Sequence, residues 1–174
     1  MKNLKKIFCL IAVVAICLCS ITSCGDDDIK YQAQTRFLYS LDGGETFKET
    51  IQEVPVNTTY YLAVEMQVVQ SAETDEEKVS VAKITIPNTN VVDCYLDDHP
   101  GVTVTGTTNV ADNSISYKFN VVAGTSPAKF RVVFECKPIS EGKASILVEY
   151  DDLVSEYWDA TGTIKYVAAE GESE

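Results

Sequence analysis

The sequence has a single histidine, His99, and a single tryptophan, Trp158, among its 174 residues. One histidine excludes a metal site built from several imidazole ligands. Neither a Gly-x-Ser-x-Gly element nor a phosphate-binding P-loop pattern occurs in the chain, so two common signatures of hydrolases and nucleotide-binding enzymes are missing. On these grounds we expect a protein that is not an enzyme.

Basic residues are scarce as well. The chain carries 14 lysine and arginine residues against 26 aspartate and glutamate residues, a formal net charge of −12. Binding to nucleic acid needs clustered lysine and arginine side chains that neutralise phosphates. We therefore expect no nucleic-acid partner, and no adsorption to an anionic membrane surface by charge alone.

The N-terminal apolar run is too short to cross a bilayer, which takes about 20 residues. Lys2, Lys5 and Lys6 precede an uninterrupted apolar stretch over Ile7–Cys19, which is 13 residues long. A basic start followed by a short apolar stretch is typical of a secretory signal peptide. We predict that residues 1–23 are such a signal peptide.

The end of this segment, Ile21-Thr22-Ser23-Cys24, resembles the bacterial lipobox. The resemblance implies that Cys24 becomes the mature N-terminus and carries a thioether-linked diacylglycerol, with palmitate as a typical acyl chain. Two or three acyl chains hold a protein on a bilayer without a transmembrane segment. The implied location is the cell envelope, as an outer-membrane lipoprotein.

The residues after the cysteine carry a second resemblance. Gly25-Asp26-Asp27-Asp28 is similar to the acidic export signal of surface lipoproteins in the Bacteroidota. This resemblance implies that Asp26, Asp27 and Asp28 direct the protein to the cell surface. The alternative is a solvated acidic linker without a sorting role.

Removal of residues 1–23 leaves a mature chain of 151 residues, about the size of one domain. The three signal-peptide lysines leave with it, so 11 basic residues face 26 acidic ones and the net charge becomes −15. We expect a lipidated tether over residues 24–30, one domain over 31–167 and a flexible tail over 168–174.

Alternating apolar positions recur along the mature chain, as expected for strands with one buried face. The predicted buried faces are Tyr60, Leu62, Val64, Met66 and Val68; Ile115, Tyr117, Phe119 and Val121; Phe130, Val132, Phe134 and Cys136; and Ala144, Ile146, Val148 and Tyr150. Turn signals between these runs predict an all-β fold, an antiparallel β-sandwich of about 7 to 9 strands. A change of parity between Val81 and Ala82 predicts a bulge, and Pro87 is expected to end that strand.

The segment from Phe130 to Asp152 is similar to the late strands of bacterial immunoglobulin-like modules. A strand is followed there by a corner from Lys137-Pro138 to Glu141-Gly142 and then by a second core strand. The resemblance implies an immunoglobulin-like β-sandwich. It does not define a function, because such sandwiches carry many functions.

Only Cys94 and Cys136 remain as thiols in the predicted domain. Both lie in line with apolar residues of their strands, so they could meet across the core. A disulfide closing that loop would stabilise the fold by roughly 4 kcal/mol. Two buried free thiols are the alternative, since sequence does not define connectivity.

Two acidic pairs are the strongest metal candidates in the chain. Asp97-Asp98 and Asp151-Asp152 could supply carboxylate ligands for calcium, although no EF-hand spacing supports them. Exposed loop acids are the simpler interpretation. We expect no cofactor, with calcium as the one alternative.

Tyr157-Trp158 follows the second acidic pair. Exposed aromatic side chains at this position could stack on a sugar ring or contact a partner protein, because they offer large rigid contact areas. The alternative is that Trp158 packs in the core of the sandwich or closes one of its ends. The leading functional hypothesis is a non-catalytic binding or scaffolding module whose ligand is a glycan or an envelope protein; the alternatives are a small carboxylate-dependent hydrolase and a structural subunit of a surface complex.

Overall fold

The computed structural model of the chain describes residues 28–51, 53–96, 107–109 and 113–169. The signal segment, Cys24, Asp26, Asp27, Asp97, Asp98 and His99 lie outside these ranges. The described residues form strands joined by turns and loops, without a helix. Accordingly, this part of the chain offers no helix that could serve as a membrane span.

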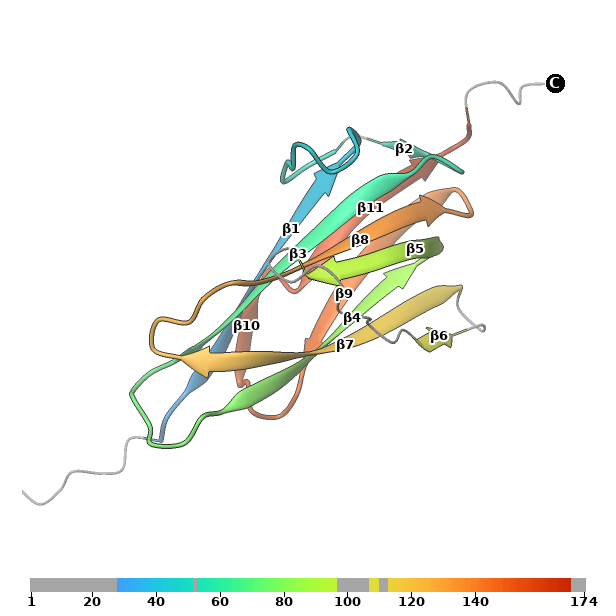
Figure 1. The fold of residues 1–174 in the computed structure, drawn as a ribbon. Coiled ribbons are helices and arrows are strands. Elements are labelled where there is room, and N and C mark those ends of the chain that lie inside the picture. Colours follow the sequence, from blue (N-terminus) through green and yellow to red (C-terminus); the bar gives the residue numbers. More distant parts are fainter. Residues whose placement is uncertain (1–27, 52, 97–106, 110–112, 170–174) are drawn as a thin grey trace, which may run out of the picture.

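Eleven strands make up the described fold (Figure 1). They are β1 (Tyr31–Ser40), β2 (Val54–Pro55), β3 (Tyr60–Gln70), β4 (Val79–Pro87), β5 (Thr89–Leu96), β6 (Thr107–Asn109), β7 (Ser114–Gly124), β8 (Phe130–Pro138), β9 (Gly142–Tyr150), β10 (Glu156–Trp158) and β11 (Thr161–Val167).

The strands form two sheets that pack face to face. Sheet A has the order β10-β1-β3-β8-β5, and sheet B has the order β6-β7-β4-β9-β11-β2. Most pairs are antiparallel, while β1 with β10, β2 with β11 and the ends of β3 and β7 pair in parallel. The all-β, immunoglobulin-like sandwich predicted from the sequence is confirmed. The expected number of about 7 to 9 strands is too low, because the described residues also form the short strands β2, β6 and β10 of two or three residues each.

The core lies between the two sheets and follows the predicted alternation. Tyr60, Leu62, Val64, Met66 and Val68 of β3 are all fully buried, and the residues between them face the other side of sheet A. The alternating residues of β7, β8 and β9 enter the same core cluster. Period-two patterning therefore predicted the buried faces of these strands correctly.

Strand β4 contradicts the predicted bulge between Val81 and Ala82. Its pairing with β7 runs without a break from Val79 to Pro87, and Ser80 occupies a fully buried position before Ala82. Burial of this hydroxyl is tolerated because Ser80 Oγ donates to the Asp151 carboxylate at 2.9 Å. The register shift lies in β5 instead, between Val91 and Asp93.

Hydroxyl groups also link the two sheets inside the core. Tyr60 of sheet A and Tyr166 of sheet B share a hydrogen bond of 2.8 Å between their hydroxyl oxygens, and Thr89 reaches Tyr166 at 2.7 Å. Thr35 and Tyr150 form a second link at 2.6 Å. These contacts satisfy polar groups that would otherwise destabilise the interior.

The two ends of the described chain lie at opposite ends of the sandwich (Figure 1). Lys30 precedes β1 and is joined to Ser71 by two hydrogen bonds, from Lys30 N to Ser71 Oγ and from Ser71 N to the Lys30 carbonyl. Strand β11 runs to the far end, where Val167 pairs with Pro55. The chain therefore enters the domain at the end that holds the loop between β3 and β4.

Candidate functional site

Trp158 lies on the surface, and the interpretation that it packs in the core is wrong. It ends the short strand β10, which pairs in parallel with β1, and 55% of its surface is exposed. Tyr157 is exposed as well, but successive residues of a strand point to opposite faces. Its ring lies beside Tyr150, with centroids 6.1 Å apart, so the two aromatic residues do not form one contact surface.

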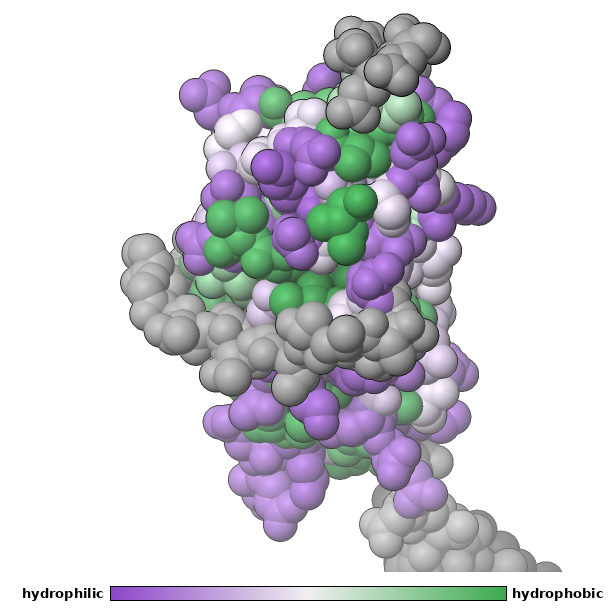
Figure 2. Space-filling view, turned by 90° about the vertical axis from the view of Figure 1, so that its right-hand side faces the viewer, coloured by the Kyte–Doolittle hydropathy of each residue, from purple (hydrophilic) through white to green (hydrophobic). Residues whose placement is uncertain are grey.

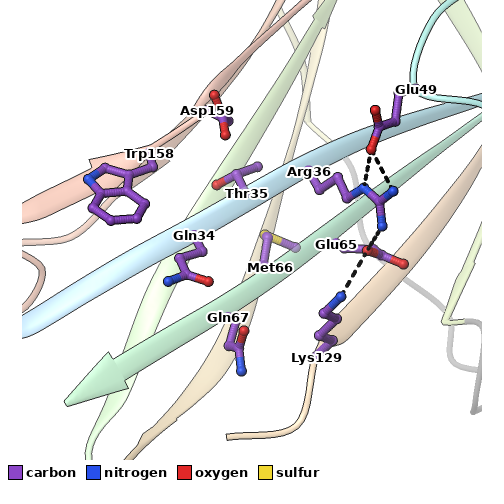
Figure 3. Close-up of a pocket in the computed structure, with 10 residues that line it drawn as sticks. All are labelled: Gln34, Thr35, Arg36, Glu49, Glu65, Met66, Gln67, Lys129, Trp158 and Asp159. Carbon is purple, nitrogen blue, oxygen red and sulfur yellow. Dashed lines mark hydrogen bonds and ion pairs between the residues drawn. The ribbon is translucent and has the colours of Figure 1, made fainter. Parts of the chain in front are cut away.

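Two glutamine residues continue the row that Trp158 begins. Gln34 of β1 is opposite Trp158, and Gln67 of β3 is opposite Gln34. These residues face away from the core, as their neighbours Ala33 and Met66 are fully buried. Figure 3 shows the Gln34 amide between the Trp158 indole and the Gln67 amide.

A charged row lies beside the first row on the same face of sheet A. Arg36 of β1 is opposite Glu65 of β3, and Glu65 is opposite Arg131 of β8. Arg36 is 2.5 Å from the Glu49 carboxylate and 3.7 Å from that of Glu65, and Lys129 is also 3.7 Å from Glu65. The ion pairs fix the charged side of the site (Figure 3).

Together these residues line an open pocket of about 320 Å³. Its walls are Gln34, Thr35, Arg36, Glu49, Glu65, Met66, Gln67, Lys129, Trp158 and Asp159. The volume is at the lower end of the range that holds small ligands. Asp159 adopts a positive φ of 52° at the point where the chain leaves sheet A for sheet B, which places its carboxylate at the rim beside Trp158.

The other half of this sheet face is covered by the loop after β1. Leu38, Ala63 and Val133 are buried there, with Phe47, Tyr61 and Tyr95 packed over them. The Arg131 guanidinium lies 4.6 Å from the centroid of the Phe47 ring, a cation–π contact. As a result, the open part of the face is the part that lies beside β10.

A tight turn holds this covering loop in place. Asp42 accepts hydrogen bonds from the hydroxyl of Ser40 and from the backbone and hydroxyl of Thr46. These bonds to Ser40 and Thr46 lower the Asp42 pKa well below its usual range. Gly43 and Gly44 take positive φ angles of 80° and 85°, which glycine adopts without steric cost.

Among the described residues, the acidic pair Asp151-Asp152 does not gather with other acids into a metal site. Asp151 instead accepts hydrogen bonds from Ser80 Oγ at 2.9 Å, Val81 N at 2.9 Å and Leu153 N at 3.3 Å, while Asp152 is exposed. Within the part of the chain that the structure describes, no three histidine, cysteine, aspartate or glutamate residues gather as a metal site would need. Asp151 has a structural role at the start of β4.

Cys94 and Cys136 are free thiols in this structure. They lie on the neighbouring strands β5 and β8, but Cys94 is opposite Phe134, and Cys136 is opposite Val91. This diagonal placement keeps the thiols close without bringing their Cα atoms directly opposite each other. Burial raises the pKa of Cys94 to about 12 and that of Cys136 further, so neither is an activated nucleophile.

Sequence reasoning found Trp158 but missed the residues beside it. Glu65 and Gln67 were recognisable as the outward face of their strand, because they alternate with the apolar residues of β3. Gln34 and Arg36 carried no comparable signal, since the buried residues that alternate with them, Ala33 and Thr35, are small or polar. Their proximity to Trp158 depends on the pairing of β1, β3 and β10, which sequence alone does not specify.

No protein-family model and no curated protein sequence matches this chain. Among solved structures, the chain is similar to a non-cellulosomal cohesin from the archaeon Archaeoglobus fulgidus, with 13% identity over 81% of this chain and 94% of that one and a TM-score of 0.44.

It is also similar to a cohesin in a type I cohesin–dockerin complex from Clostridium thermocellum, with 9% identity over 77% of this chain and 99% of that chain and a TM-score of 0.45. A third similar structure is the major pilin SpaD from Corynebacterium diphtheriae, with 14% identity over 78% of this chain and 33% of that chain and a TM-score of 0.44. These are similarities of fold.

Proposed function

We propose that this chain is a lipid-anchored envelope protein that binds a ligand non-covalently in the pocket beside Trp158. The observation that carries the proposal is the exposed indole at the edge of a pocket lined by polar side chains. Exposure of a large aromatic group costs hydration free energy in the free protein, and a ligand that covers the ring recovers it. The ligand class is a glycan or an envelope protein.

The charges in the pocket favour binding over catalysis. Hydrolysis of a glycoside by two carboxyl groups needs one of them in the protonated form. Glu49 and Glu65 are instead held in ion pairs, Glu49 with Arg36 and Glu65 with both Arg36 and Lys129.

The anchoring part of the proposal depends on the sequence before the domain. Cys24 is the lipidated residue, and the lipid holds the protein at the outer membrane, with Asp26, Asp27 and Asp28 directing it to the cell surface. The high negative charge of the mature chain supports a lipid anchor over electrostatic adsorption to anionic lipid. The described chain enters the sandwich at one end, beside the loop between β3 and β4 (Figure 1).

The binding proposal is tested with the full-length protein in detergent on two immobilised arrays, one of oligosaccharides and one of envelope proteins. Trp158→Ala is expected to lose binding to at least one array member that Tyr157→Ala still binds. Tyr157→Ala is the matched control because it removes an equally exposed aromatic residue from the opposite face of β10. Equal binding by both variants, or no binding by the wild type, contradicts the proposal.

The same samples test the hydrolase alternative. Oligosaccharides incubated with the protein are expected to keep their chain length, as measured by mass spectrometry. Shortened products that disappear in a Glu65→Gln variant would replace the binding proposal with a hydrolase.

A further inference from the structure

We infer that the Trp158 pocket takes an uncharged oligosaccharide, bound across strands β10, β1 and β3 with one sugar ring on the indole. This inference depends on the proposed binding function and specifies its ligand. It is based on three features of the pocket: the aromatic surface, the row of amides and the balance of charges.

The aromatic surface and the amide row have the dimensions of a short saccharide. Trp158, Gln34 and Gln67 are in register on three neighbouring strands. With a strand spacing of about 4.8 Å, the row extends about 10 Å across the sheet. This length accommodates at least two linked sugar rings, one stacked on the indole and the next over the glutamine residues.

The two amides have free hydrogen-bonding groups for hydroxyls. No hydrogen bond within the described residues occupies the side chain of Gln34, while Gln67 donates through Nε2 to the Pro127 carbonyl at 2.7 Å and keeps Oε1 free. An amide offers both a donor and an acceptor. Sugar hydroxyls need both, because each one donates one hydrogen bond and accepts others.

The bond from Gln67 to Pro127 also fixes the orientation of this amide. Nε2 is held by the loop between β7 and β8. Oε1 is therefore already oriented as an acceptor, and the Gln67 side chain does not need to become ordered when a ligand binds. A fixed partner reduces the conformational entropy that a ligand must overcome.

The charges of the pocket disfavour an anionic ligand. Its two cations, Arg36 and Lys129, are both engaged with Glu49 or Glu65, and Asp159 adds a third carboxylate. A sulfate, phosphate or uronate group would have to displace these ion pairs in a protein that already carries excess negative charge. The uncharged hydroxyl groups of a neutral sugar face no such cost, and Asp159 can accept a hydrogen bond from one of them.

A peptide ligand would be expected to contact a different set of residues. The outer edge of β10 has no partner strand among the described residues, so an extended peptide would pair with the backbone of β10. Such a ligand would reach Trp158 but not Gln67, which lies two strands away. Dependence on Gln67 therefore distinguishes a saccharide from an added strand.

Trp158 is the only tryptophan of the chain, so its fluorescence reports on this pocket alone. The experiment titrates the full-length protein in detergent with neutral hexasaccharides of glucose, mannose, xylose and galactose in different linkages. Oligogalacturonate serves as the anionic probe, and a pool of synthetic extended peptides as the peptide probe. A stacked ring is expected to shift the emission and to protect the indole from acrylamide quenching.

Four variants define the contacts, with calorimetry as the readout where tryptophan is lost. Gln34→Ala and Gln67→Ala are each expected to weaken binding about fivefold, as for the loss of one neutral hydrogen bond, and Trp158→Ala about 30-fold or more. Gln32→Ala is the matched control: Gln32 is on the same strand and face as Gln34, but contacts Glu156 at 3.3 Å and does not line the pocket. It should bind like the wild type.

The outcomes separate the inference from the proposed function. Saturable binding of a neutral hexasaccharide that weakens in Gln34→Ala and Gln67→Ala, and not in Gln32→Ala, supports the inference. Trp158-dependent binding of oligogalacturonate or peptide alone overturns the inference but leaves the proposed function standing. If no probe binds and the arrays also show no ligand that depends on Trp158, both fail.

Discussion

Phe37 of β1 in sheet A lies directly against Gly162 of β11 in sheet B, across the interface between the two sheets. A Cβ atom on Gly162 would stand 2.7 Å from the Phe37 Cγ atom, and 2.9 Å from the Tyr39 hydroxyl. Such distances are shorter than carbon–carbon contacts permit. The packing between the two sheets therefore depends on the absence of a side chain at Gly162.

Gly162→Ala should destabilise the fold by about 1–3 kcal/mol, the usual cost of overpacking a core. Urea unfolding followed by circular dichroism measures the change. Gly124→Ala is the control, because its nearest neighbour is the Pro127 Cβ at 3.6 Å, an ordinary contact. Phe37→Leu should recover part of the loss when combined with Gly162→Ala, and an equal effect of the two glycine variants would contradict the packing argument.

Asp151→Ala should cost roughly 1–3 kcal/mol of unfolding free energy, because it leaves the buried Ser80 hydroxyl and the Val81 amide without their acceptor. Asp152→Ala, which changes an exposed neighbour, should change the free energy by less than about 0.5 kcal/mol. Thermal unfolding with and without calcium completes the test. A calcium-dependent rise in melting temperature that Asp151→Ala removes would show a metal site instead.

Cys94 and Cys136 should resist alkylation by iodoacetamide in the native protein at pH 8. Burial disfavours the reactive thiolate and raises the pKa of both groups. In denaturant without reductant, mass spectrometry should find both cysteines modified. Absence of modification at both positions in the denatured, non-reduced sample would show that they form a disulfide in cells.

The raised thiol pKa also predicts a loss of stability at alkaline pH. The native state holds the Cys94 proton up to a pKa of about 12, whereas the unfolded chain releases it near the ordinary thiol pKa of 9.0. The unfolded state therefore binds fewer protons between these values, and stability falls as the pH rises above about 9. A Cys94→Ala variant should show a weaker fall in urea midpoint between pH 8 and pH 10, and an unchanged slope would contradict this assignment.

The anchor predicts a change of cellular fraction on a single substitution. In the Cys24→Ala variant, the signal peptide should stay uncleaved or the mass of the lipid should be absent. The protein should then no longer appear in the detergent-extracted membrane fraction. A variant with Asp26, Asp27 and Asp28 changed to alanine should stay lipidated but resist external protease on intact cells. Equal protease sensitivity of this variant and the wild type would remove the sorting role from the three aspartates.

The sequence patterns predicted the strands with large apolar residues at every second position, and they failed where small or polar residues take those positions. Strand β3 was readable because each inward residue is bulky and apolar. In β4, a buried serine replaced an apolar residue, and its acceptor Asp151 lies 71 positions along the chain, so the pattern suggested a bulge that does not exist.

The candidate site was only partly predictable for a related reason. Whether Trp158 is exposed or buried depends on whether β10 lies at the edge of a sheet. The sequence of a three-residue strand does not contain that information. The residues that complete the pocket come from β1 and β3 and from the loops that hold Glu49 and Lys129. Their convergence follows from strand pairing between distant parts of the chain.

Strand β1 also determines how the domain responds to force. It connects Lys30 to sheet A and pairs with β3 at ten positions, while β10 lies along its other side. Hydrogen bonds between antiparallel strands run perpendicular to the strand direction. A pull on the N-terminal end along β1 therefore loads many bonds at once in shear, so the strand that carries Gln34 and Arg36 resists being peeled away when the tether is under tension.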